Sequence, residues 1–445
     1  MKKIICFFMV SMFFQNIVLG QKDNETSLKY RRSTLHTILM ESEHFLYKDT
    51  VIKAYNEAPF PDKYNEHRIL EKSFNPLNFP VTDADRLADS LSQTKAGKFV
   101  KNLLSTATSG IIDSELKDYP ITIRKYFEAT GMAKELVAKW FNRQPDGTFD
   151  MNLIGERGFY DANQMQANIA KGAARGDALL ADAGEELIKN TFVVVSKMNF
   201  VSNEKVAAAV RAIAILKANE ISSELLRETA IKSAEKMYEQ TKDGYSVWTT
   251  SFLYQLEWND SIAAIFYQDF WMDKSNIDAN KKQAFDNSDL FQLKLLGSEK
   301  ATSLVLFSGE GKNTPDEIIK VATIRNIERV YAKLQKNYDV FKTKTPIWSI
   351  DPITAKIGKK EGLEGGEKFE ILEQVIDSKT GLTKYVSKGK ITVDKDQIWD
   401  NRFNLDGKII ELPDEDQNAT NNVEATVFKG SSKNLYTGML IKQVK

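Results

Sequence analysis

The hydrophobic pattern changes its period twice along the chain. Residues 21–150 show mostly helical spacing, interrupted by breaks rich in proline and asparagine, and residues 151–348 mix helical and strand-like spacing. From 349 to 445, short apolar runs are separated by glycine, asparagine and aspartate. We therefore expect an α+β protein with a helical N-terminal region, a central mixed α/β domain and a C-terminal small β-barrel or sandwich.

Strand-like patterns are clearest in the central domain. The β-branched run Thr191–Val195 predicts a short buried strand. Alternating large residues over 248–258 predict a longer strand with one buried face, and 262–271 is expected to return as its partner. Leu293–Leu296 and Leu304–Phe307 predict a further hairpin.

Helices are expected between these strands. Residues 203–219 form one, and Ser222 is placed to cap the next, whose apolar face would hold Leu226, Ala230, Ala234 and Met237. The clearest helix start is Thr314, because Pro315 follows it and Glu317 completes a capping box. A strand over 338–345 is expected after this helix. In the last region the predicted strands cover 353–357, 367–376, 383–393, 408–412, 423–428 and 434–443.

The first twenty residues match a secretory signal peptide. Lys2 and Lys3 precede an apolar run over 4–14, which is too short for a membrane span of about 20 residues. Cleavage before Gln21 would also remove Cys6, the only cysteine. We therefore expect an exported, cysteine-free chain located in the periplasm or associated with the outer membrane, with exposure at the cell surface as a further alternative.

The charge balance is close to neutral, with 61 basic and 61 acidic residues. Removing Lys2 and Lys3 leaves 59 basic residues, a net charge of −2, and a nucleic-acid-binding domain is usually strongly basic. We therefore expect no nucleic-acid partner. No segment after the signal is apolar for long enough to form a transmembrane helix, and the pattern leaves the oligomeric state open.

No motif predicts catalytic, cofactor-binding or metal-binding residues. His36, His44 and His67 lack the His-Glu-x-x-His spacing, and there is no Gly-x-Ser-x-Gly elbow. Residues 309–314 depart from the phosphate-loop pattern and are explained by a turn before a capped helix. The aspartates near 394–400 and 414–416 lack calcium-loop spacing and are expected to lie in solvated turns.

Two segments are candidates for an interaction surface. Gly172, Gly176 and Gly184 recur at multiples of four along a predicted helix, which indicates close internal packing or a smooth binding face. Large aromatic residues on the strand over 248–258 indicate core or, if the hairpin is an edge, a strand-addition site. The candidate surface residues are Arg157, Arg175, Asp177, Asp182, Trp248, Tyr254 and Trp258.

Several segments between about 140 and 405 resemble an uncharacterised family of exported Bacteroidota proteins. They are 157–162, 181–195, 357–363, 369–373 and 399–402. The resemblance implies the compartment and carries no activity and no functional residues. In architecture, a helix leading into Thr191–Val195 and a terminal β-module with Gly-x-x-x-Gly before Phe369 resemble periplasmic proteins of the curli-secretion and flagellar-assembly type, which are binding and assembly components.

We expect a non-enzymatic cell-envelope protein that binds other envelope proteins, without a cofactor. One alternative is a hydrolase that acts on envelope or extracellular polymers through paired carboxylates, which leave no sequence motif. Another is a carbohydrate- or surface-binding module that uses the aromatic strand. The three function classes make different demands on the surface, so the fold and its exposed side chains distinguish them.

Overall fold

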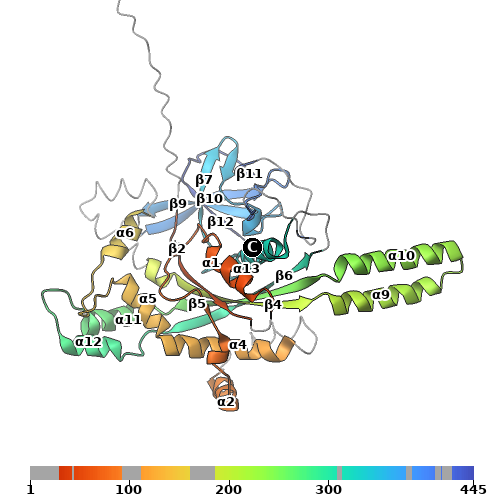
Figure 1. Cartoon of the computed structure of the whole chain (residues 1–445). Helices are drawn as coiled ribbons and strands as arrows, with labels where there is room; N and C mark the ends of the chain where they lie inside the picture. The colour runs from red at the N-terminus through yellow and green to blue at the C-terminus, as the bar shows by residue number, and fades with distance from the viewer. Residues whose placement is uncertain are drawn as a thin grey trace, which may run out of the picture.

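The computed structural model describes residues 30–42, 45–92, 112–160, 186–307, 313–376, 383–405, 412 and 423–444. Within these ranges the chain is an α+β protein, as expected, with a mixed sheet, flanking helices and a C-terminal β-barrel (Figure 1). The predicted signal peptide lies outside the described residues.

The central sheet has six strands in the order β2-β1-β4-β5-β6, and β3 also pairs with β1. Strand β1 runs parallel to β2, β3 and β4, whereas β4, β5 and β6 are antiparallel. The strands span Thr34–Met40 (β1), Asn65–Glu66 (β2), Ser73–Phe74 (β3), Thr191–Ser202 (β4), Gly244–Leu256 (β5) and Leu293–Leu306 (β6).

Strand β4 is apolar without alternation because both of its faces are covered. Val193 and Val195 belong to the core on one face of the sheet, while Phe192, Val194 and Met198 belong to the core on the other. A strand buried on both faces is expected to show such a continuous apolar run. This arrangement places the Thr191–Val195 run at the centre of a layered protein.

One face of the sheet is covered by helices rich in aromatic residues. The core there joins Trp140 of α5 (Met132–Trp140) and Phe141, which follows the helix, to Phe252 and Tyr254 of β5. The other elements on or near this side are η1 (Pro76–Asn78), α2 (Asp83–Ser92), α4 (Ile112–Thr130), α6 (Asn152–Tyr160), α11 (Asp260–Ile265), η2 (Phe266–Phe270) and α12 (Ala279–Asp286).

The opposite face is covered by α1 (Lys48–Glu57) and α13 (Pro315–Asn337). Helix α13 begins as predicted: Thr314 accepts from the Glu317 N–H, and the Glu317 carboxylate accepts from the Thr314 N–H at 2.8 Å. Ile319, Val330 and Leu334 of α13 are fully buried against the sheet. Two helices thus separate the sheet from the C-terminal barrel.

The C-terminal region closes into a six-stranded barrel in the order β10-β11-β8-β7-β12-β9. Closure removes free strand edges, and Ile347, Phe369 and Phe428 fill the interior. The strands span Thr345–Ile350 (β7), Ile353–Ala355 (β8), Lys368–Ile376 (β9), Thr383–Val393 (β10), Thr426–Lys429 (β11) and Leu440–Gln443 (β12), with a short helix η3 at Lys359–Glu361.

Strand pairing in the structure crosses both boundaries between the three expected regions. Strand β1 comes from the region expected to be mostly helical, yet it pairs along its whole length with β4. Strand β7 starts the barrel at Thr345, where a strand over 338–345 was predicted to end the central domain. Pairing partners that lie more than 150 residues apart leave no local periodicity, so the sequence pattern did not reveal them.

Two further strand predictions were wrong. Residues 262–271 form α11 and η2 instead of a strand, because Asn259 caps a helix by accepting from the Ile262 N–H at 3.0 Å. The apolar pairs at 293–296 and 304–307 are the two ends of one strand, β6, instead of a hairpin. The polar stretch between them belongs to an edge strand, where exposed charged side chains are common.

Candidate functional site

A helical hairpin extends away from the body between strands β4 and β5. We call it the arm: it comprises α9 (Glu204–Asn219) and α10 (Glu224–Thr241), which run side by side beyond the end of the sheet (Figure 1). At 1.5 Å per residue, the helices are about 24 and 27 Å long. The alanine-rich sequence of α9 favours a helix strongly, so the arm is helical for local reasons.

The base of the arm is held tightly to the sheet. Asn203 is buried, and its side chain donates to the Val305 carbonyl and accepts from the Ser246 hydroxyl at 2.9 Å. At Gly244 any β-carbon would lie 2.0 Å from the Val305 carbonyl oxygen. Phe45 stacks on Phe200 at 4.0 Å beside this point. These contacts give the arm a fixed direction relative to the body.

The two helices of the arm contact each other along a seam of small residues. Ala207 and Ala218 of α9 and Ala234 of α10 are the buried positions. Arg211 crosses the seam to form an ion pair with Glu235 at 2.6 Å. A single seam of this kind buries little apolar surface, so most of each helix faces outward.

Large apolar side chains are concentrated on the outward surface of the arm. Helical geometry places Val210 of α9 on the same side as Leu226 and Met237 of α10, about a quarter turn from the seam, with Ile213 next to them. We call these four residues the apolar flank; their exposures are 47%, 60%, 57% and 55% respectively. Leu216 and Leu225 are also exposed near the tip. Monomeric proteins rarely leave such groups of side chains uncovered without a function.

Charges on the arm are balanced, and in α10 they lie away from the apolar flank, whereas Lys217 of α9 lies on the same side as Val210. The segment 204–241 contains six basic and six acidic residues. Glu228 and Lys232 of α10 lie on the opposite side of the arm from Leu226, by the same helical geometry. Within the part of the chain that the structure describes, no helix is long and apolar enough to cross a membrane.

Arg157, predicted as a surface residue, joins three elements of the body. Its guanidinium donates to His67 Nδ1 at 2.9 Å and to the Glu66 carbonyl at 2.8 Å, and it lies 4.7 Å above the Trp140 ring. His67 is fully buried and donates from Nε2 to the Leu136 carbonyl at 3.0 Å. Burial, followed by the charge of Arg157, holds the pKa of His67 well below its usual value. Arg157 therefore supports the packing around a neutral histidine.

The other predicted surface residues do not form one site. Arg175, Asp177 and Asp182 lie outside the described residues, as does the glycine series. Tyr254 and Trp258 are only 4% and 6% exposed and belong to the core, which corrects their assignment to a possible interaction surface. Trp248 is half-buried on β5. The alternation over 248–258 therefore reflects burial beneath the helices and not an exposed aromatic face.

Metal-binding side chains do not cluster in the described residues. His36 lies in strand β1, not in a helix, and is 1% exposed, while His44 is outside the described residues. Asp394 pairs with Lys429 at 3.0 Å, and Asp400 pairs with Arg402 at 2.6 Å. No group of three or more potential ligands comes together among the residues described.

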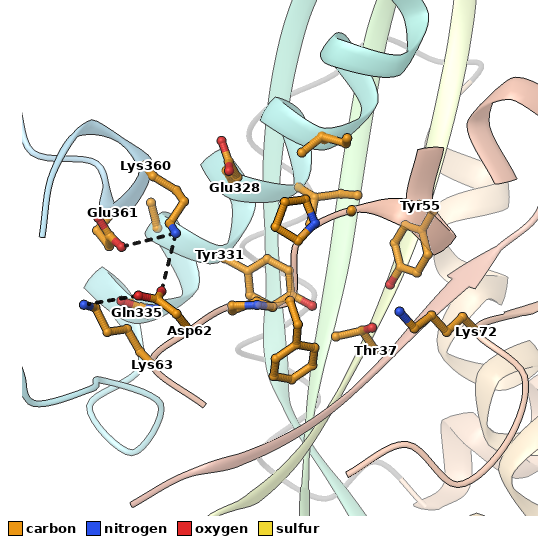
Figure 2. Close-up of a pocket in the computed structure, with 17 residues that line it drawn as sticks. Thr37, Tyr55, Asp62, Lys63, Lys72, Glu328, Tyr331, Gln335, Lys360 and Glu361 are labelled. Carbon is orange, nitrogen blue, oxygen red and sulfur yellow. Dashed lines mark hydrogen bonds and ion pairs between the residues drawn. The ribbon is translucent and has the colours of Figure 1, made fainter. Parts of the chain in front are cut away.

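Carboxylates with shifted pKa values meet where α13, the loop after α1 and the barrel come together (Figure 2). Lys360 forms ion pairs with Asp62 at 3.4 Å and with Glu361 at 3.9 Å. Burial raises the pKa of Glu328 to about 7. Burial also acts to raise the pKa of Asp62, but Lys63 and Lys360 outweigh it and lower that pKa. The cluster joins the C-terminal region to α13, since the Glu328 carboxylate also accepts from the Phe403 N–H at 3.3 Å.

Sequence reasoning missed the apolar flank because the apolar face of α10 was taken to be the face that packs against the rest of the protein. The predicted face of α10 contains Leu226 and Met237, but only Ala234 of that face is buried. The signal was present in α9, which has apolar residues on almost every side and is therefore typical of a helix covered by other elements. No known protein-family model matches the sequence, and a search of curated proteins found no significant relative.

Proposed function

We propose that this chain is an exported, non-enzymatic protein of the cell envelope that binds another envelope protein through its α9–α10 arm. The observation that carries the proposal is the exposure of the apolar flank on a rigidly held hairpin. Six of the seventeen large apolar side chains that are strongly exposed among the described residues lie on this arm. The envelope location rests on the signal-peptide pattern and on the resemblance to exported Bacteroidota proteins.

The chemistry of the arm favours a helical partner. Two helices with one shared seam leave both outer faces free, and a third helix that packs against Val210, Ile213, Leu226 and Met237 would complete a bundle. In helix-in-groove recognition an amphipathic helix lays its apolar face against such a surface. The partner we propose therefore contributes an amphipathic helix whose apolar face covers the flank.

The charge distribution argues against a lipid surface as the occupant. Helices that bind anionic membranes carry an excess of lysine and arginine on the polar face. The arm has equal numbers of basic and acidic residues, and Glu228 and Glu239 lie among the lysines of its polar side. Balanced charge is typical of helices that pack against other helices.

Site-specific cross-linking tests the proposal. A photoreactive benzoylphenylalanine replaces Ile213 or Leu226 in cells that produce the protein, and Glu228 or Lys232 on the polar side serves as the matched control position. We expect one identified envelope protein to be captured from the flank positions and not from the controls, and the purified pair to form a complex. Capture of a second copy of this chain, or equal capture from all four positions, would contradict the proposed partner.

The hydrolase alternative is supported by one observation, the opposed pKa shifts of Glu328 and Asp62 beside the same pocket. Pairs of carboxyl groups whose environments separate their pKa values can act as acid and base. The test is release of soluble fragments from purified cell-wall polymer by the full chain, with Glu328→Gln as the inactive variant. Equal release by both proteins excludes this pair. Burial of Tyr254 and Trp258 leaves the aromatic-strand binding module without support.

A further inference from the structure

A cavity lies between α1, α13 and the edge of strand β1. Its volume is about 70 Å³, and its walls are mostly apolar, with Phe60, Ile324 and Ile327 among the lining residues (Figure 2). A cavity of about 150 Å³ holds a benzene molecule, which has six non-hydrogen atoms, so this one has room for a ligand of about three or four non-hydrogen atoms. The cavity is separate from the α9–α10 arm and uses none of its residues.

Two tyrosine hydroxyls are buried in the cavity, and one of them has no hydrogen-bond partner. Tyr55 and Tyr331 are 4% and 6% exposed. The Tyr331 hydroxyl has no hydrogen-bond partner among the described residues, whereas the Tyr55 hydroxyl lies beside the side chains of Thr37 and Ser196. Figure 2 shows both hydroxyls directed toward Thr37. Buried hydroxyls are nearly always satisfied, because burial of an unpaired polar group is unfavourable, so we expect something else to complete the hydrogen bonds of Tyr331.

The sheet edge beside these hydroxyls is also open. The Leu35 carbonyl accepts from the His67 N–H at 3.0 Å, and the Leu39 N–H donates to the Lys72 carbonyl at 2.7 Å. In a parallel ladder alternate residues point to the same neighbouring strand, so the N–H and C=O of Thr37 point to this side as well. Strand β2 has ended and β3 has not begun at Thr37, which leaves both groups without a strand partner.

The amino group of Lys72 also faces this end of the cavity. Lys72 lines the cavity and forms no ion pair with any described residue; its amino group makes only a long contact of 3.4 Å with the Asn56 carbonyl. Figure 2 shows the Lys72 amino group directed toward Thr37 and Tyr55. This end of the cavity therefore offers four donors, namely an ammonium group, two phenolic hydroxyls and the Thr37 N–H, beside one acceptor, the Thr37 carbonyl.

We propose that the cavity binds a small carboxylate whose charged group meets Lys72, Tyr55, Tyr331 and the Thr37 N–H, and whose short apolar part lies against Phe60, Ile324 and Ile327. The donor-rich end matches the four lone-pair directions of a carboxylate. The apolar walls exclude a fully hydrated inorganic anion, which would lose its water without compensation along them. A ligand pocket with apolar walls and a few convergent polar groups has this general composition.

Calorimetric titration and thermal unfolding of the purified full chain test the proposal, with acetate as the probe and acetamide as its neutral match. We expect acetate to bind and to raise the unfolding temperature, and acetamide to bind at least about tenfold more weakly, because it lacks the charge. Absence of both formate and acetate binding, or equal binding of acetate and acetamide, overturns the proposal.

Matched tyrosine variants identify the site. Tyr331→Phe removes one unpartnered hydroxyl inside the cavity, whereas Tyr254→Phe removes one on the other face of the sheet. We expect about tenfold weaker acetate binding in Tyr331→Phe and in Lys72→Met, and unchanged binding in Tyr254→Phe. The unfolding temperature of ligand-free Tyr331→Phe should not fall, since no protein hydrogen bond is lost. Undiminished binding in Tyr331→Phe and Lys72→Met would contradict the assignment.

Discussion

At the scale of single residues, the body of the protein keeps two histidines neutral. His36 and His67 are 1% and 0% exposed, and both have lowered pKa values, mainly because burial disfavours the charged ring. For His36 the pKa falls to about 4, and the charges of Lys139, Arg68 and Lys72 contribute after burial. Protonation of either ring therefore favours unfolding.

This predicts acid destabilisation with a defined window. A histidine with a folded pKa of about 4 and an unfolded value of about 6.5 leaves stability intact above pH 6.5 and lowers it as the pH falls toward 4. In His36→Leu we expect the loss in free energy of unfolding between pH 7 and pH 4.5 to shrink by roughly 2 to 3 kcal/mol. Urea unfolding at both pH values measures this difference. Parallel curves for the two proteins would show that His36 is accessible to protons in the folded state.

The raised pKa of Glu328 predicts the opposite dependence of the free energy of unfolding on pH. Its folded pKa of about 7 lies above the unfolded value of about 4.5, so the folded state holds the proton longer, and stability falls as the pH rises from 4.5 to 7. The free energy of unfolding of Glu328→Gln should therefore rise by roughly 2 to 3 kcal/mol relative to that of the wild type when the pH is raised from 5 to 8. The free energy of unfolding at these two pH values gives the comparison. An equal difference at both would rule out a buried, protonated Glu328.

Some residue-scale features were readable in the sequence and others were not. The capping box at Thr314 was readable because all of its atoms lie within four residues. The contact of Arg157 with His67 was not, since ninety residues separate them and each residue type is common on surfaces. Arg157 was selected for its charge, and its observed role in packing follows from the tertiary fold alone.

At the scale of elements, the junction between β5 and the arm explains how an exposed hairpin keeps its direction. Gly244 leaves room for the Val305 carbonyl, and Asn203 bonds to the same strand. The aromatic contacts of Phe45, Phe200 and Tyr245 cover this junction. A rigid base lowers the entropy that a partner must remove on binding.

Gly244→Ala tests the junction. The added methyl group would lie 2.0 Å from the Val305 oxygen, so β5 and β6 must separate locally. We expect a loss of about 1 to 3 kcal/mol in the free energy of unfolding. Gly155→Ala is the control, because nothing lies within 4 Å of a β-carbon there. Equal stability of the two variants would show that the strands yield at the arm base without strain.

The apolar flank predicts a separation of stability from binding. Ile213 and Leu226 are 55% and 60% exposed, so Ile213→Glu combined with Leu226→Glu should change the free energy of unfolding by less than about 1 kcal/mol. The same double variant should also be less prone to self-association at high concentration, because it loses exposed apolar surface. Urea unfolding and light scattering measure the two effects. A large loss of stability would mean that the flank is covered by the chain itself.

Local patterns predicted elements where the segment was long and its environment uniform. The helix over 203–219 agrees with α9, and the predicted strand over 383–393 agrees with β10. The predictions from local patterns were wrong where a capping residue decided the structure. Asn259 caps a helix, so the apolar run after it begins with α11. The single strand β6 was predicted as two strands because its middle is polar, and an edge strand exposes side chains that a central strand would bury.

At the scale of the whole molecule, the layers combine regions that the hydrophobic pattern separated. Strand β1 inserts an N-terminal segment into the central sheet, and Tyr30, just before it, hydrogen-bonds Tyr385 of the barrel. The α+β class and a C-terminal all-β region, either barrel or sandwich, followed from the hydrophobic pattern and turn spacing, and the structure shows that this region is a closed barrel. The order of strands and the pairing of helices depend on contacts across hundreds of residues.

The central claim is that the apolar flank of the α9–α10 arm binds an envelope protein. The most direct test is quantitative capture from envelope extracts by the tagged full chain, with Ile213→Glu plus Leu226→Glu compared against Glu228→Lys plus Lys232→Glu on the polar side. We expect the flank variant to capture at least about tenfold less of the identified partner, since two apolar anchors that the partner would bury are removed. The polar-side variant should capture as much as the wild type. Equal capture by the flank variant and the wild type would contradict the account.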